Sequence, residues 1–132
     1  MIWHLLTGEY PPGCGGVGDY TATVAQGLVA AGDTVHVWTF RAPGAAAPAR
    51  HDGVVVHELP DRFAARSRAV LSNAWRGMPG TVLLQYVPNA LGSRGANLRF
   101  CLWLRKIHHA GTDVRIMFHE PYFYFSVVRP WR

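Results

Sequence analysis

The stretch TGEYPPGCGGVGDYTATVAQGLVAAG, residues 7–32, holds a glycine-rich loop that runs directly into a helical pattern. Gly13, Gly15 and Gly18 satisfy the pattern G-x-G-x-x-G, and apolar residues from Tyr20 onward recur at helical spacing. Glycines between a strand and a helix let the backbone turn sharply and bring free amides close to an anion. The stretch therefore predicts a strand–loop–helix unit with a candidate anion site at the start of the helix.

Apolar runs and turn residues place the other elements. Strands are predicted over residues 2–7, 34–40, 54–60, 81–87 and 113–118, and helices over residues 62–77 and 95–111. Gly32 is expected to end the first helix, and residues 41–53 to form a loop because they are rich in Pro, Gly and Ala. The strands are continuous apolar runs, which is typical of a parallel sheet covered on both faces. We therefore expect a doubly wound, mainly parallel, Rossmann-like α/β sheet.

Composition narrows the class of protein. The 132 residues suffice for one domain with a core, and the formal net charge of +5 favours anionic partners. The basic residues are scattered, so nucleic acid is not expected as a partner. Two cysteines make no disulfide framework, and neither a secretory signal nor a run of membrane-spanning length is found. A cytoplasmic protein is expected, and peripheral contact with the inner face of a membrane stays open.

The glycine loop has two interpretations that need no comparison with a known family. A dinucleotide-binding fold requires an acidic residue near the end of the second strand, but that strand ends in WTFR, residues 38–41. Arg41 can hold the 2′-phosphate of NADP, so an NADP-dependent oxidoreductase is one alternative. The other is a flexible surface loop without a ligand.

A third interpretation comes from three segments in order. PPGCGGVGDYTATVAQGLVAAGDTVHVWT (11–39), LLQYVPNALGSRGANLRFCLWL (83–104) and VRIMFHEPYF (114–123) together resemble the N-terminal domain of GT-B fold glycosyltransferases of family 4, group 1. This resemblance implies a two-domain enzyme that moves a sugar from a nucleotide-sugar donor to a glycan or lipid-linked acceptor with retention of configuration. The N-terminal domain holds the acceptor, and the C-terminal domain holds the nucleotide. Neither a metal nor a cofactor besides the donor substrate is expected.

The resemblance covers only the front part of such an enzyme. Residues 1–132 correspond to a partial acceptor-side domain, and nothing in them matches the nucleotide-sugar domain with its pair of glutamates seven residues apart. We therefore expect an N-terminal fragment that is inactive alone and exposes apolar surface where further strands pack. A non-catalytic half-domain that binds a protein or glycan is the alternative outside the enzymes.

The resemblance also assigns roles to the glycine loop. Gly15, Gly16 and Gly18 match the family's loop by position. The backbone amides of Gly16, Val17 and Gly18 would donate to the pyrophosphate of the donor as the glycosidic bond breaks.

The remaining site residues follow the later strands. His119 matches the family histidine at the end of the fifth parallel strand, where it would contact the donor sugar or stabilise the developing positive charge. Glu120 would orient His119 or bind an acceptor hydroxyl. Substrate-binding roles are expected for four further residues, namely Gln85, Tyr86, Asn89 and Tyr122. The other histidines lack metal-ligand spacing, so no metal site is predicted.

Overall fold

The computed structural model describes residues 1–13, 15–40, 50–91 and 97–120. The strands are β1 (Ile2–Leu6), β2 (Thr34–Thr39), β3 (Arg50–His51), β4 (Val54–Glu58), β5 (Thr81–Tyr86) and β6 (Val114–Phe118). The helices are α1 (Gly16–Ala30), α2 (Ala65–Gly77) and α3 (Leu98–His109). Every helix and strand predicted from the sequence is therefore present, with ends shifted by a few residues.

The strands form one sheet in the order β3-β4-β2-β1-β5-β6. β1 lies in its middle, with Leu5 opposite Val37 of β2 and Leu83 of β5, and all neighbours from β4 to β6 run parallel. The chain first extends the sheet from β1 to β2 and β4, and later from β1 to β5 and β6. The direction of winding thus changes between β1 and β5, which is where ligands bind in open parallel sheets.

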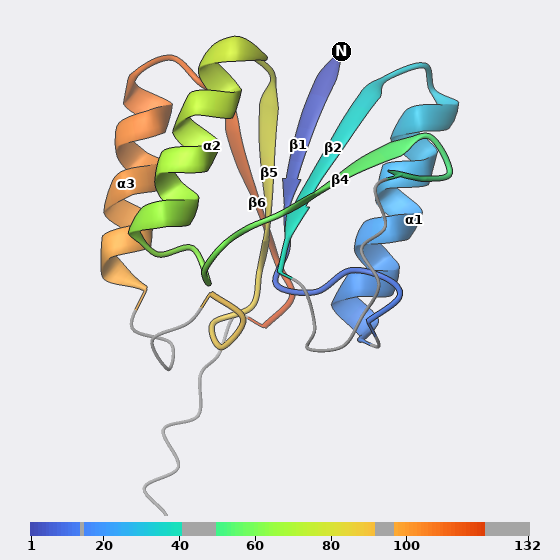
Figure 1. Cartoon of the computed structure of the whole chain (residues 1–132), viewed down its shortest axis with the longest axis horizontal. Coiled ribbons are helices and arrows are strands. Elements are labelled where there is room, and N and C mark those ends of the chain that lie inside the picture. Colours follow the sequence, from blue (N-terminus) through green and yellow to red (C-terminus); the bar gives the residue numbers. More distant parts are fainter. Residues whose placement is uncertain (14, 41–49, 92–96, 121–132) are drawn as a thin grey trace, which may run out of the picture.

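Helices cover both faces of the sheet (Figure 1). On one face, α1 packs Ala22 and Ala25 against Leu5 and neighbouring valines of β2 and β4. On the other face, α2 and α3 contribute Leu71, Trp75, Phe100 and Leu104 to a core with strand residues such as Leu84. The expected doubly wound, mainly parallel Rossmann-like arrangement is confirmed.

One strand was not predicted. β3 lies within residues 41–53, which the sequence analysis assigned to a loop, and it pairs antiparallel with β4. Asp52 and Gly53 form the connection and have φ angles of 48° and 83°. Positive φ at both central residues is typical of a two-residue hairpin turn, for which Asp-Gly is a strong signal. The loop prediction was wrong for this hairpin because residues 41–53 were assigned as a whole from their Pro, Gly and Ala content, and the Asp-Gly turn signal was not considered.

Gly32 ends the first helix as expected. Its φ is 89°, its amide donates to the carbonyl of Val29, and the amide of Asp33 donates to the carbonyl of Leu28. These two hydrogen bonds satisfy carbonyl groups that the last turn leaves unpaired, in the Schellman arrangement.

The outer strand β6 exposes apolar side chains. Ile116, Met117 and Phe118 are 45%, 39% and 58% exposed. Exposed apolar side chains are not confined to β6, since Leu98 and Leu102 on α3 are 70% and 52% exposed, and the expectation that further strands pack on the chain stays a prediction. No helix among the described residues is long and apolar enough to cross a membrane.

Three histidines line the middle of the sheet beneath α2. His4 accepts a hydrogen bond from Trp38 Nε1 at Nδ1 (3.2 Å) and donates one from Nε2 to the carbonyl of Met78 (2.8 Å). His36 Nδ1 lies 2.8 Å from His57 Nε2, and the His57 ring stacks on Trp38 at 3.9 Å. Burial lowers the pKa of all three, and that of His57 falls to about 4 with a contribution from the other two rings.

These histidines predict that the protein loses stability in mild acid. Their folded-state pKa values lie below the unfolded value near 6.5, so the unfolded chain binds more protons as the pH falls. The free energy of unfolding should therefore be constant above pH 6.5 and drop toward pH 4, with about 2–3 kcal/mol of the loss due to His57. Urea unfolding at a series of pH values measures this. His57→Gln should flatten the dependence, whereas the same change at exposed His109 should leave it as it is.

Substitution of alanine at two glycines, Gly80 and Gly27, is expected to change the stability of the protein in opposite directions. A Cβ on Gly80 would lie 2.5 Å from the carbonyl oxygen of Ile2, which is backbone and cannot move aside, whereas a Cβ on Gly27 in α1 meets nothing within 4 Å. Gly80→Ala should cost about 1–3 kcal/mol, and Gly27→Ala should add about 0.5–1 kcal/mol of stability. Thermal unfolding of both variants checks the pair, and a neutral Gly80→Ala would contradict this close contact.

Candidate functional site

A cavity of about 510 Å³ lies at the carboxyl ends of the strands. It is lined by Gly8 and Glu9 after β1, by residues 15–17 at the start of α1, by Val87 and Ala90 after β5, and by His119 and Glu120 after β6. A Cβ on Gly8 would overlap Ala90, so only glycine lets these two loops meet. The cavity therefore occupies the place where the winding of the sheet changes direction.

Glu9 caps the start of α1. The amides of Val17 and Gly18 both donate to Glu9 Oε1, at 3.1 and 3.2 Å. Thr7, which is fully buried, donates from its hydroxyl to the Glu9 carbonyl at 2.8 Å and fixes the loop. The N-cap residue of α1 is Gly15, which has no side chain to bind these amides. A carboxylate at this helix end is favourable because of both the unpaired amides and the helix dipole.

The glycine at position 15 makes room for this carboxylate. A Cβ on Gly15 would overlap the carboxyl group of Glu9, whereas a Cβ on Gly16 meets nothing within 4 Å. Of the three amides that the resemblance assigns to pyrophosphate, those of Val17 and Gly18 thus donate to a side chain of this same chain, whereas the Gly16 amide does not bond to Glu9. Glu9 was not singled out from the sequence, because it lies far before the helix and fits no local capping pattern.

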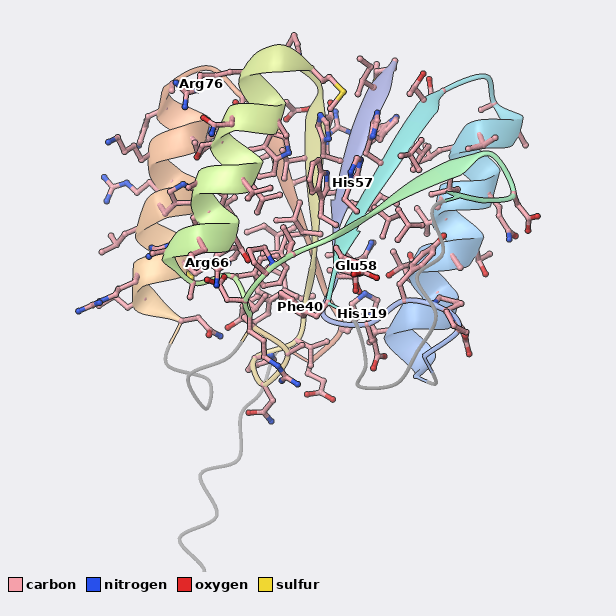
Figure 2. The ribbon with its side chains drawn as sticks, in the orientation of Figure 1. Phe40, His57, Glu58, Arg66, Arg76 and His119 are labelled. Atoms are coloured by element: carbon pink, nitrogen blue, oxygen red, sulfur yellow. The ribbon has the colours of Figure 1, made fainter. Side chains whose placement is uncertain are left out.

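His119, which is labelled in Figure 2, contacts three neighbouring residues. Its Nε2 lies 2.6 Å from Oε1 of Gln85, and its amide donates to the carbonyl of Tyr86 at 3.1 Å. The ring of Tyr20 on α1 meets the imidazole edge to face at 5.1 Å. With Gln85 accepting, His119 donates from Nε2, and Nδ1 is left as an acceptor. Tyr20 was predicted only as a helix residue, so its contact with His119 is new.

The other expected substrate-binding residues lie in different places. Gln85 is fully buried beneath His119, so it acts on a ligand only through the imidazole. Tyr86 points to the opposite face of the sheet, where its ring packs on Phe118 at 5.2 Å. Asn89 is exposed in the turn after β5 and does not line the cavity. Tyr122 lies outside the described residues, as does Arg41.

The cavity thus brings together residues from the loops after β1, β5 and β6 and from the start of α1. Gly15, Gly16 and Val17 meet His119 and Glu120 there, and Gly18 adjoins them through its bond to Glu9. Such a set can accept hydrogen bonds from hydroxyl groups and can transfer a proton at His119. Within residues 1–13, 15–40, 50–91 and 97–120, no group of three or more His, Cys, Asp or Glu side chains is arranged to hold a metal ion.

Comparisons with protein-family models, with curated proteins and with solved structures found no significant match to the chain. The glycosyltransferase resemblance of the three segments therefore stays a prediction, and the function is argued below from the site.

The contact between Glu9 and Gly15 predicts a coupled effect on stability. Gly15→Ala should push the Glu9 carboxylate off the two amides and cost about 1–2 kcal/mol, and Glu9→Ala should cost a similar amount. In the Glu9→Ala background, Gly15→Ala should cost little more. Urea unfolding of the two single variants and the double variant gives the coupling energy, with Gly16→Ala as the matched control. Additive costs would show that Gly15 is required for another reason.

Proposed function

We propose that this chain is the acceptor-side domain of a retaining GT-B glycosyltransferase that works in the cytoplasm. The observation that carries the proposal is the cavity itself. It joins the glycine loop, the end of β5 and the histidine after β6 at the switch point of a doubly wound sheet. The proposal places a glycan or lipid-linked acceptor in this cavity and a nucleotide-sugar donor in a second domain that follows in the natural protein.

The chemistry of the lining suits a sugar. Sugar hydroxyl groups donate to carboxylates and to neutral imidazole, and Glu9, Glu120 and His119 offer these acceptors around one space. Gln85 keeps His119 in one orientation and in one tautomer. In this proposal His119 faces the sugar that is transferred, and Gln85 is a positioning residue.

The test starts with the coding sequence beyond Arg132. The proposal expects the reading frame to continue into a second α/β domain with a Glu-x₇-Glu pair. With the full-length protein, turnover of a panel of nucleotide-sugars in the presence of glycan and lipid-linked acceptors measures the activity. A reading frame that ends at Arg132, or a full-length protein without turnover of any nucleotide-sugar, would overturn the proposal.

Variants at the imidazole then test the site. His119→Ala should lower kcat/KM at least tenfold, equivalent to about 1.4 kcal/mol. His109→Ala, at the exposed end of α3, is the matched control and should keep wild-type turnover. Gln85→Leu should lower kcat less than His119→Ala, and adding it to His119→Ala should change nothing further, because Gln85 acts through the imidazole. Independent effects of the two changes would contradict this role of Gln85.

A further inference from the structure

We propose that the outer face of helices α2 and α3 binds the surface of an anionic lipid bilayer, as a peripheral contact that does not cross the membrane. The basic residues are spread along the sequence, but the fold gathers many of them on this face. The inference goes beyond the proposed function and does not depend on it, because none of the described residues that line the cavity belongs to α2 or α3.

The helices on the two faces of the sheet differ in charge. α1 contains one carboxylate, Asp19, and no Arg or Lys, whereas α2 and α3 contain three cations each and no Asp or Glu. α2 and α3 cover the same face of the sheet (Figure 1), and Arg68 of α2 donates to the carbonyl of Arg99 in α3 at 3.2 Å. The fold therefore brings six cations onto one face. These are Arg66, Arg68 and Arg76 of α2 and Arg99, Arg105 and Lys106 of α3.

Carboxylates do not neutralise this face. The segment from Arg62 to Thr112 holds no Asp or Glu, and the same is true of every stretch of the chain outside the described residues. Asp61 and Asp113 border the segment, but Asp61 binds the first amides of α2, and Asp113 pairs with Arg115 at 3.0 Å. The hydrogen bonds of the six cations to described residues end on carbonyls, an amide and an imidazole. Their charge therefore stays available to an anionic partner.

Aliphatic side chains lie among these cations on α3. Leu98 and Leu102 are one turn apart and more than half exposed, and Lys106 follows after one more turn. Phe100 and Leu104 lie on the side of the helix that is buried in the core. The two leucines are therefore on the outer side, next to cations. Apolar side chains flanked by Lys and Arg are typical of helices that lie in the interface between a membrane and water.

The leucines distinguish between two classes of anionic partner. Nucleic acid binds basic surfaces mainly through its phosphates, which the cations alone would satisfy. A bilayer takes up aliphatic side chains at the level of its headgroups, while Lys and Arg nearby attract the anionic lipids. A lipid surface therefore accounts for the charge and for the exposed leucines, whereas nucleic acid accounts only for the charge.

The experiment measures how much of the full-length protein sediments with vesicles of phosphatidylcholine alone, and with vesicles of equal parts phosphatidylcholine and phosphatidylglycerol. Lys106→Gln removes one cation of the face, and Arg115→Gln is its matched control. Leu102→Ala removes one exposed aliphatic side chain, and Met117→Ala is its matched control. Both control residues are exposed on β6, at positions that alternate with those lining the groove against α3, so they lie on the other face of the sheet. Circular dichroism confirms that the variants fold.

We expect the wild type to sediment with the anionic vesicles and not with phosphatidylcholine alone. Lys106→Gln and Leu102→Ala should each lower the partition coefficient about fivefold, and the two controls should lower it less than about twofold. Raised salt should weaken the binding of the wild type, because it screens the exposed cations.

Four results would overturn the inference. These are no sedimentation with anionic vesicles, equal sedimentation with neutral vesicles, losses in the controls as large as in Lys106→Gln and Leu102→Ala, and tighter binding to a mixed-sequence duplex DNA than to the anionic vesicles. The last result would assign the face to nucleic acid. The transferase proposal keeps its own test, which is the turnover of nucleotide-sugars.

Discussion

The parallel pairing of β1 with both β2 and β5 is the constraint on which the candidate site depends. Parallel neighbours in register bring their carboxyl ends to one edge of the sheet, so the loop after β1 meets the turn after β5. The pairing of β5 with β6 then adds His119 to the same edge. Segments that are more than a hundred residues apart in the chain, such as Glu9 and Glu120, consequently border one cavity.

Glu9 gives the glycine loop a structural role that the glycine pattern alone does not reveal. The start of a helix leaves amides without partners, and the N-cap residue here is a glycine that cannot supply one. A carboxylate from the preceding loop satisfies two of these amides, and Gly15 leaves it the necessary room. Glycines at a strand-to-helix turn therefore admit either a ligand's phosphate or the chain's own side chain. The spacing G-x-G-x-x-G is the same in both cases, so only the placement of Glu9 distinguishes them.

The helices and strands were predictable because the spacing of apolar residues and the turn-forming residues are local features of the sequence. Apolar runs gave the parallel strands, and Gly32 marked the end of α1. The placement of side chains was predictable only in part. Gln85 and Tyr86 are consecutive in a strand and so must point to opposite faces, which means that a single cavity cannot receive both. Glu9 and Tyr20 could not be found, because their contacts with Val17 and His119 arise only when α1 folds back against the sheet.

The number of histidines in the sequence says little about the site, because hydrogen bonding decides which ring nitrogen is available. Both nitrogens of His4 are occupied, one by Trp38 and one by the carbonyl of Met78. His36 and His57 are bonded to each other, and burial keeps their pKa values low. These rings are neutral parts of the core. His119 is tied at Nε2 alone and borders the cavity, so its Nδ1 can meet a ligand. His119 therefore has a nitrogen left beside the cavity, and the role that the resemblance gives this residue stays a prediction.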